Sequence, residues 1–175
     1  ITNPLISITK TLITPASGPF FEYDLLAFQI DITNIGNTDI ITLPLVDDFS
    51  GYCLDFQSAS ITPDGYGSGI IVWDDLGALA VGNTISLTTQ FMILNACDPA
   101  INEAEVAFAI DENGYIVPTV MDEAQLSIES TPVAIDDEDV TYPGEVVTVA
   151  VLDNDYDIND NLHQVMFRTT GVTRS

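Results

Sequence analysis

The sequence predicts an all-β protein, built as an antiparallel two-sheet sandwich with a short, incomplete second β unit after it. Short segments that alternate apolar and polar residues recur along the chain, as in half-buried strands. Gly, Pro, Asn and Asp separate these segments, and helix-type patterns of Ala, Leu, Glu and Lys are almost absent. Apolar residues make up 46% of the 175 residues, which is enough for a packed core.

The strands follow one another with turn signals between them. Pro44 interrupts the third segment, Pro63-Asp64-Gly65 separates the fourth and fifth, and Asn113-Gly114 is a hairpin signal between two later ones. About eight strands at this spacing are typical of an immunoglobulin-like sandwich. The predicted strands are 5–14, 22–33, 39–47, 53–61, 69–74, 84–94, 103–110, 114–120 and 123–129.

A change in composition divides the chain into two units, predicted as 1–130 and 131–175. The segment 130–133 has the composition of a linker. Two strand-like segments follow, 134–142 and 145–152, joined by Pro143-Gly144. An immunoglobulin-like domain needs about 100 residues, so the second unit is too short to bury a full core alone. We expect either that further residues complete it or that a neighbouring chain adds a strand, from its Ile1–Thr14 end.

Charge limits the partners that the protein can have. The chain has 27 acidic residues, only three basic residues (Lys10, Arg168 and Arg174), and a net charge of −24. This excludes nucleic acid and anionic membranes as partners, and no apolar run approaches the roughly 18 residues of a membrane helix. Divalent cations, high salt or simple spreading over the surface would have to offset the repulsion.

The two cysteines, Cys53 and Cys97, predict a disulfide. An even cysteine count in a β protein of extracellular character is typical of a structural disulfide, and the alternative is two buried free thiols. No cysteine or histidine spacing typical of a zinc site is present in the sequence.

Five segments in order resemble a known surface repeat. They read ISITKTL, FQIDITNIGNTDI, LVDDF, WDDLGALAVGNTISLTTQFMI and CDPAINEAEVAF. Together they resemble the bacterial and archaeal conserved surface-repeat domain, domain of unknown function eleven, over about residues 4–130. The resemblance implies an immunoglobulin-like sandwich from a cell-surface, adhesin or filament protein, usually present in tandem.

The remaining segment, TPVAIDDEDVTYPGEVVTVAVLDNDYDIND, resembles the start of cadherin-like bacterial tandem repeats. Its acidic loop places carboxylates at alternate positions, and Ca²⁺ takes roughly six to eight oxygen ligands. In cadherin-like tandems, acids at the junction help to rigidify it. The predicted calcium ligands are therefore Asp153, Asp155, Asp157 and Asp160, together with Asp136 and Asp137. The alternative is a solvated acidic turn.

Lys10 is the only lysine and lies in the middle of the first predicted strand. Some surface-fibre sandwiches join such a lysine to an asparagine by an isopeptide bond, with a nearby acid assisting. Asn102 is the best partner here, and Asp47 or Asp31 the best helper, because burial favours a neutral amine and a protonated carboxyl. The alternative, which we favour from the sequence, is that strand parity places Lys10 on the solvent face among the acids.

These features predict a structural repeat of an extracellular fibre, filament, biofilm matrix or adhesin, acting as a stiff spacer that contacts copies of itself or neighbouring tandem domains. The alternative is a carbohydrate- or host-surface-binding module, with Trp73 and the aromatic residues Phe20, Phe21, Tyr23 and Phe28 as a sugar platform or, as we favour, as core. We predict no enzyme. The sequence has one histidine, His163, and no nucleophile or metalloprotease motif, and strand neighbours such as Asp47-Asp48 and Asp74-Asp75 point to opposite faces.

Overall fold

The structure, a computed structural model, describes residues 2–137 and 153–156. The chain divides into two compact units, Ile1–Glu129 and Ser130–Ser175. All regular elements in the described residues are strands, as predicted, and none of these residues forms a helix that is long and apolar enough to cross a membrane.

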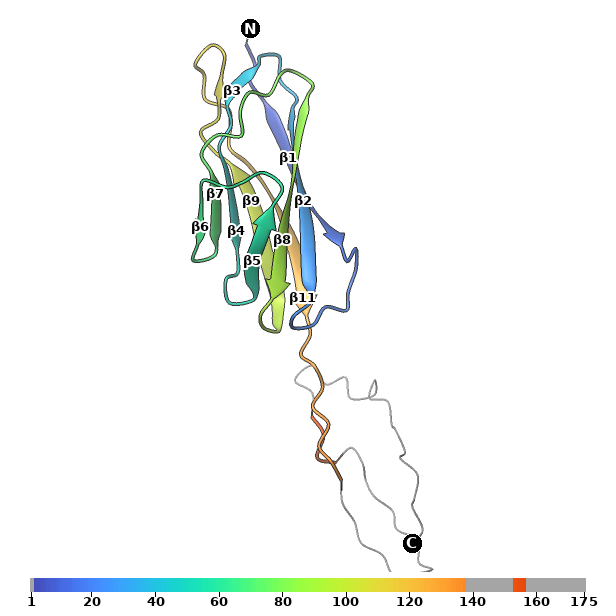
Figure 1. The fold of residues 1–175 in the computed structure, drawn as a ribbon. Coiled ribbons are helices and arrows are strands. Elements are labelled where there is room, and N and C mark those ends of the chain that lie inside the picture. Colours follow the sequence, from blue (N-terminus) through green and yellow to red (C-terminus); the bar gives the residue numbers. More distant parts are fainter. Residues whose placement is uncertain (1, 138–152, 157–175) are drawn as a thin grey trace, which may run out of the picture. The chain divides into compact units, whose positions relative to one another are not determined.

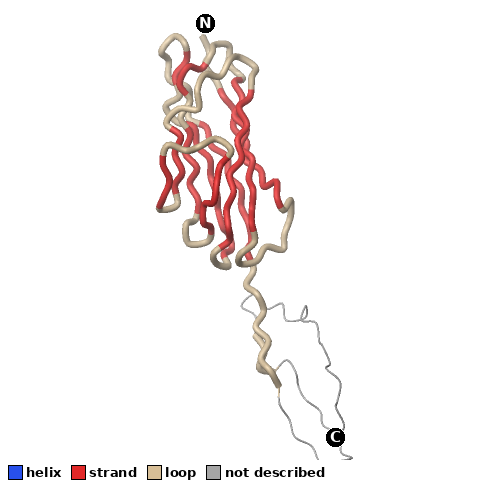
Figure 2. The backbone as a smooth tube through the Cα atoms, viewed as in Figure 1, coloured by secondary structure: helices blue, strands red, loops and turns tan. Residues whose placement is uncertain are grey.

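The first unit consists of two packed antiparallel sheets (Figures 1 and 2). The four-stranded sheet has the order β1-β2-β8-β5, and the five-stranded sheet has the order β11-β9-β4-β7-β6. A small two-stranded sheet pairs β10 with β3. The strands are β1 (Ile6–Thr14), β2 (Leu25–Asn34), β3 (Ile40–Thr42), β4 (Leu45–Phe49), β5 (Leu54–Ala59), β6 (Gly65–Gly67), β7 (Ile70–Trp73), β8 (Thr84–Ile93), β9 (Cys97–Val106), β10 (Ile110–Asp111) and β11 (Val120–Ile128).

Alternation along the strands builds the core between the sheets. Each second residue of β2 is buried, and the same period runs along β8. Edge-to-face contacts join the ring of Phe91 to those of Phe28, Phe49 and Phe56, with centroids 5.0–5.9 Å apart. Burial of this alternating apolar set holds the two sheets together.

The strand boundaries predicted around Asn113-Gly114 are wrong. The turn itself is present, but it closes only β10, which pairs with β3, and a single bridge joins Ile110 to Ile116. The carboxylate of Asp111 accepts the backbone N–H groups of Asn113 and Tyr115, so this side chain replaces the ladder partners that a longer hairpin would need. The residues 114–119 form no strand, and β11 begins at Val120.

The predicted start of β9 is also wrong. This strand begins at Cys97, six residues before the predicted 103, and continues through Pro99. The ladder between β9 and β11 shifts register between Leu126 and Ile128, opposite this proline. A proline is tolerated at such an irregularity because no regular ladder bond needs its missing N–H. Pro44, by contrast, separates β3 from β4 as predicted.

The first strand completes its own sandwich. β1 pairs with β2 from Ile6 to Thr14, and its other edge lies along β11, where the N–H of Lys10 donates to the carboxylate of Asp122 over 2.7 Å. Donation of Ile1–Thr14 to a neighbouring chain would require β1 to leave this sheet, so strand sharing stays a prediction.

The second unit is described only in part. Val133 and Tyr156 form an antiparallel bridge with two backbone hydrogen bonds, Val133 N to Tyr156 O at 2.8 Å and Tyr156 N to Val133 O at 3.1 Å. The predicted segment 145–152 lies outside the described residues, as does most of 134–142.

The predicted disulfide is present. Cys53 and Cys97 are joined with a Cα–Cα distance of 6.0 Å, linking the turn before β5 to the first residue of β9. The bond therefore connects the two sheets at the end of the sandwich where these elements meet.

Reducing this disulfide should destabilise the first unit. The bond closes a separation of 44 residues, and a loop of this size restricts the unfolded chain by about 4 kcal/mol. We expect the double variant Cys53→Ala/Cys97→Ala to show a lower Tm than the oxidised parent, measured by circular dichroism. The parent in reductant should approach the variant, and equal Tm values for all three samples would contradict this expectation.

Candidate functional site

Lys10 lies inside the sandwich. Its side chain has no exposed surface, so the favoured expectation of a solvent-facing lysine is wrong. The period of β1 explains its placement, because Ile6, Ile8 and Lys10 share one face and the first two are core residues. The parity of the strand thus directs Lys10 inward, where it lies opposite Ile30 of β2.

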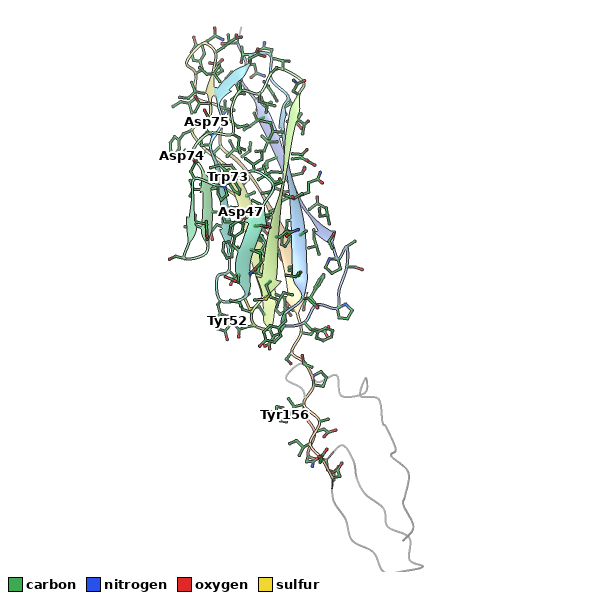
Figure 3. All side chains as sticks on the ribbon, in the orientation of Figure 1. Asp47, Tyr52, Trp73, Asp74, Asp75 and Tyr156 are labelled. Atoms are coloured by element: carbon green, nitrogen blue, oxygen red, sulfur yellow. A yellow bond between two sulfur atoms is a disulfide. The ribbon has the colours of Figure 1, made fainter. Side chains whose placement is uncertain are left out.

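Asp47 is the hydrogen-bond partner of Lys10 in the core. It lies on β4 between the buried residues Leu45 and Phe49, and its Oδ1 is 2.6 Å from Lys10 Nζ (Figure 3 shows Asp47 in the interior). Both side chains are fully buried in this contact. The ring of Phe28 lies 5.6 Å from Lys10 Nζ, which adds an aromatic wall to the site.

Asn102 faces the same space from β9. In the ladder between β4 and β9, Asp47 is opposite Ala104 and Phe49 is opposite Asn102, so Asp47 and Asn102 are diagonal neighbours on the inward face. Asn102 is fully buried, and among the described residues neither its amide nitrogen nor its amide oxygen has a hydrogen-bond partner. A buried amide without partners costs roughly 1–3 kcal/mol for each group, so this asparagine requires an explanation.

Burial shifts both ionisable groups towards their neutral forms. Desolvation lowers the pKa of Lys10, and the nearby charge of Asp47 offsets only part of this effect. Desolvation likewise raises the pKa of Asp47 against the opposing influence of Lys10. The buried environment therefore favours a neutral amine beside a protonated carboxyl more strongly than solvent would.

Thr89 completes the polar group and was not found from the sequence. It lies on the inward face of β8 with no exposed surface, close enough to Asp47 to lower the pKa of the carboxyl, although its hydroxyl makes no well-formed hydrogen bond. The interruption of an apolar strand face by Thr89 was the available signal. Asp31, the second helper considered, lies on the outer face of β2, where it accepts hydrogen bonds from Gln29 and Ser86.

The other sequence-predicted residues have structural places. Trp73 is 1% exposed and its Nε1 donates to the carbonyl of Ile61, so it is a core residue, as are Phe20 and Phe28. Phe21 is half-buried and Tyr23 is exposed, so the five aromatic residues form no shared platform. Asp47 is buried while Asp48 is exposed, and Asp75 accepts the N–H groups of Leu43 and Gly77, so neither acidic pair has the arrangement of a catalytic pair.

The predicted calcium ligands are described only in part. Asp136, Asp137 and Asp153 are exposed, and Asp155 accepts the N–H of Ile135 over 2.8 Å. Asp157 and Asp160 lie outside the described residues. Among residues 2–137 and 153–156, no group of three or more acidic, histidine or cysteine side chains could hold a metal ion.

Comparison with known proteins identifies the fold. No family model matches the sequence, and no curated protein matches it. The full-length major pilin SpaD of Corynebacterium diphtheriae is similar in structure, with a TM-score of 0.55 and 16% identity over 81% of this chain and 40% of that chain. A cohesin module from a Clostridium perfringens family 33 glycoside hydrolase has a TM-score of 0.52 and 8% identity, over 74% of this chain and 100% of its own. These likenesses confirm an immunoglobulin-like β-sandwich.

Replacing Lys10 tests the electrostatics of the core. In Lys10→Met, Asp47 keeps its burial but loses its partner, which typically costs about 3–5 kcal/mol. The pKa of Asp47 is already raised by burial, so an unpaired Asp47 disfavours folding only above the pH at which the unfolded carboxyl ionises. We expect the stability deficit in urea to be larger at pH 7 than at pH 4. The double variant Lys10→Met/Asp47→Leu should abolish this pH dependence, and a pH-independent deficit in the single variant would contradict the account.

Calcium binding remains a prediction. If the acidic residues of 136–160 hold Ca²⁺, the ion should relieve repulsion and raise the Tm by mass action. Calorimetry in calcium and in chelator at constant ionic strength measures this difference. An equal rise with any salt would indicate general charge screening instead.

Proposed function

We propose that the first unit is a load-bearing spacer module of an extracellular surface protein or fibre, clamped by an intramolecular isopeptide bond between Lys10 and Asn102. The observation that carries this proposal is the fully buried contact between Lys10 and Asp47 beside an asparagine whose amide has no partner. Lys10 is in contact with Asp47, and Asn102 is the diagonal neighbour of Asp47 on the inward face, so one carboxyl lies next to both proposed reactants.

The chemistry requires only these three side chains. The neutral Nζ of Lys10 attacks Cγ of Asn102, while the protonated carboxyl of Asp47 donates to the amide and stabilises the developing charge. Asp47 then moves the proton released by Nζ to the departing nitrogen, so that ammonia leaves and an amide joins the two side chains. The directions of both pKa shifts favour the required starting forms.

The strands involved support a mechanical role. Lys10 lies on β1 of one sheet and Asn102 on β9 of the other, and β9 pairs directly with β11, the last strand of the unit. A bond between Lys10 and Asn102 would carry tension from β1 to the ladder between β9 and β11, bypassing the residues between them. Such a route suits a module pulled from its two ends.

Three further features agree with an extracellular setting. The disulfide suits an oxidising environment, and the charge of −24 keeps the molecule soluble and separate from anionic surfaces. The resemblance to surface repeats adds neighbouring tandem modules, or copies of this chain, as the partners that a spacer would contact. A role in adhesion or in a biofilm matrix belongs to the same proposal.

Intact mass decides whether the bond forms. The purified chain should be about 17 Da lighter than its disulfide-bonded sequence mass, because condensation with asparagine releases ammonia. Asp47→Asn should abolish the loss, since it removes the proton relay and keeps the side-chain shape. Asp48→Asn, its neighbour on the outer face, is the matched control and should keep the loss. A parent mass equal to the sequence mass with the disulfide would overturn the proposed clamp.

Force spectroscopy tests the spacer role itself. Positions 10 and 102 are 92 residues apart in sequence (102 − 10), a segment of roughly 300 Å when extended. In the parent this length should be missing from the unfolding step. With reductant present, Asp47→Asn should recover it and Asp48→Asn should not, whereas full extension of the parent would exclude a load-bearing clamp.

A further inference from the structure

A pocket opens at the side of the sandwich opposite the β1–β11 seam. The outer strands on this side are β5 in one sheet and β6 in the other. The pocket has a volume of about 550 Å³, within the range of small-molecule sites. Its lining is rich in aromatic residues and glycines: Phe49, Gly51, Tyr52, Leu54, Asp55, Phe56, Tyr66, Gly67, Ser68 and Gly69.

Aromatic rings form its most exposed walls. Phe56 and Tyr66 lie with ring centroids 5.1 Å apart at 59°, and Tyr52 belongs to the same lining. The exposed fractions of Tyr52 and Tyr66 are 71% and 70%, so both rings are open to a ligand. The rings thus offer apolar faces and polar tips to a ligand.

The backbone under these rings is held in place. The disulfide of Cys53 fixes the turn beside Tyr52, whose carbonyl also accepts the side-chain N–H of Asn95. Gly69 has φ of +85°, and a Cβ there would lie 2.7 Å from the carbonyl oxygen of Phe49. The close approach of these backbones forms the floor of the pocket, and only glycine permits it. The site is therefore preformed, which lowers the entropic cost of binding.

The lining of this pocket carries little charge compared with the rest of the molecule. In a chain with 27 acidic residues, only Asp55 among the ten lining residues is charged. Its carboxylate accepts a hydrogen bond from Gln57 over 2.7 Å and has further acceptor capacity for ligand hydroxyls. The net charge of −24 opposes anionic ligands. Exposed aromatic rings beside a single acceptor carboxylate suit a neutral ligand that has both apolar C–H faces and donor hydroxyls.

We infer that this pocket binds a neutral sugar unit of a polysaccharide. The C–H faces of a sugar ring would pack on Tyr52 and Tyr66, and its hydroxyls would donate to Asp55 and contact Ser68. The geometry disfavours an added peptide strand, because a register shift between Phe56 and Ser58 breaks the edge of β5 and β6 has only three residues. This site is independent of the proposed clamp, which lies in the core.

Affinity electrophoresis of the full chain tests this inference. The probes are soluble β-glucan, mannan and xylan, each cast into native gels, with anionic alginate as the charge control. At least one neutral polysaccharide should retard the parent, and alginate should not. Retardation by none of the three neutral probes would overturn the inference.

Matched tyrosine variants locate the site. Tyr52→Ala/Tyr66→Ala should weaken binding of the retarding polysaccharide at least tenfold. The Tm should fall only slightly, through loss of the contact between Tyr66 and Phe56, because both tyrosine rings are largely exposed. Tyr115→Ala removes an exposed tyrosine outside the pocket lining and should bind as the parent does. Retained binding in the double variant, or loss of binding in Tyr115→Ala, would overturn the assignment. So would binding of an extended peptide in place of glycan.

Discussion

The contact between Lys10 and Asp47 is the constraint around which the core of this sandwich is arranged. It joins β1 of one sheet to β4 of the other, through side chains that have no exposed surface. A buried pair of this kind is seldom stabilising compared with apolar residues of the same volume. The pair lies with Thr89 and Asn102 in a small polar group between the two sheets, and within the described residues the Asn102 amide has no hydrogen-bond partner.

The two sides of the sandwich differ because of how the sheet edges are used. On one side the carboxylate of Asp122 accepts the N–H of Lys10, which links β1 to β11. This backbone N–H is then not available to pair with a strand of another molecule. On the other side β5 and β6 diverge around aromatic residues and glycines. The disulfide stabilises the turn beside this opening. The fold thus has one closed side, where β1 and β11 are linked, and one open side, where the pocket lies.

The sequence predicted the fold class well because alternation and turn residues are local signals. The bounds predicted for β1 and β8 are within one residue of those observed, and those for β2 are within three. The errors in the strand boundaries fall where the local sequence pattern does not decide the structure. At Asp111 a carboxylate holds a turn where a longer hairpin is predicted, and Pro99 lies within a strand because the ladder shifts register beside it. The pocket could not be predicted, because Tyr52 and Tyr66 come together only through the packing of two sheets. For Lys10, the parity with Ile6 and Ile8 was visible in the sequence, and the charge of the side chain was given too much weight.

The scarcity of basic residues has a consequence for resistance to proteolysis. Trypsin-like proteases cleave after lysine or arginine, and the first unit contains only Lys10 as such a residue. That residue lies in the middle of a paired strand with its side chain sealed in the core. Cleavage needs an extended, accessible backbone, so this site becomes available only when the unit has already unfolded. The buried lysine thereby leaves a folded unit of about 129 residues without an accessible tryptic site in its native state.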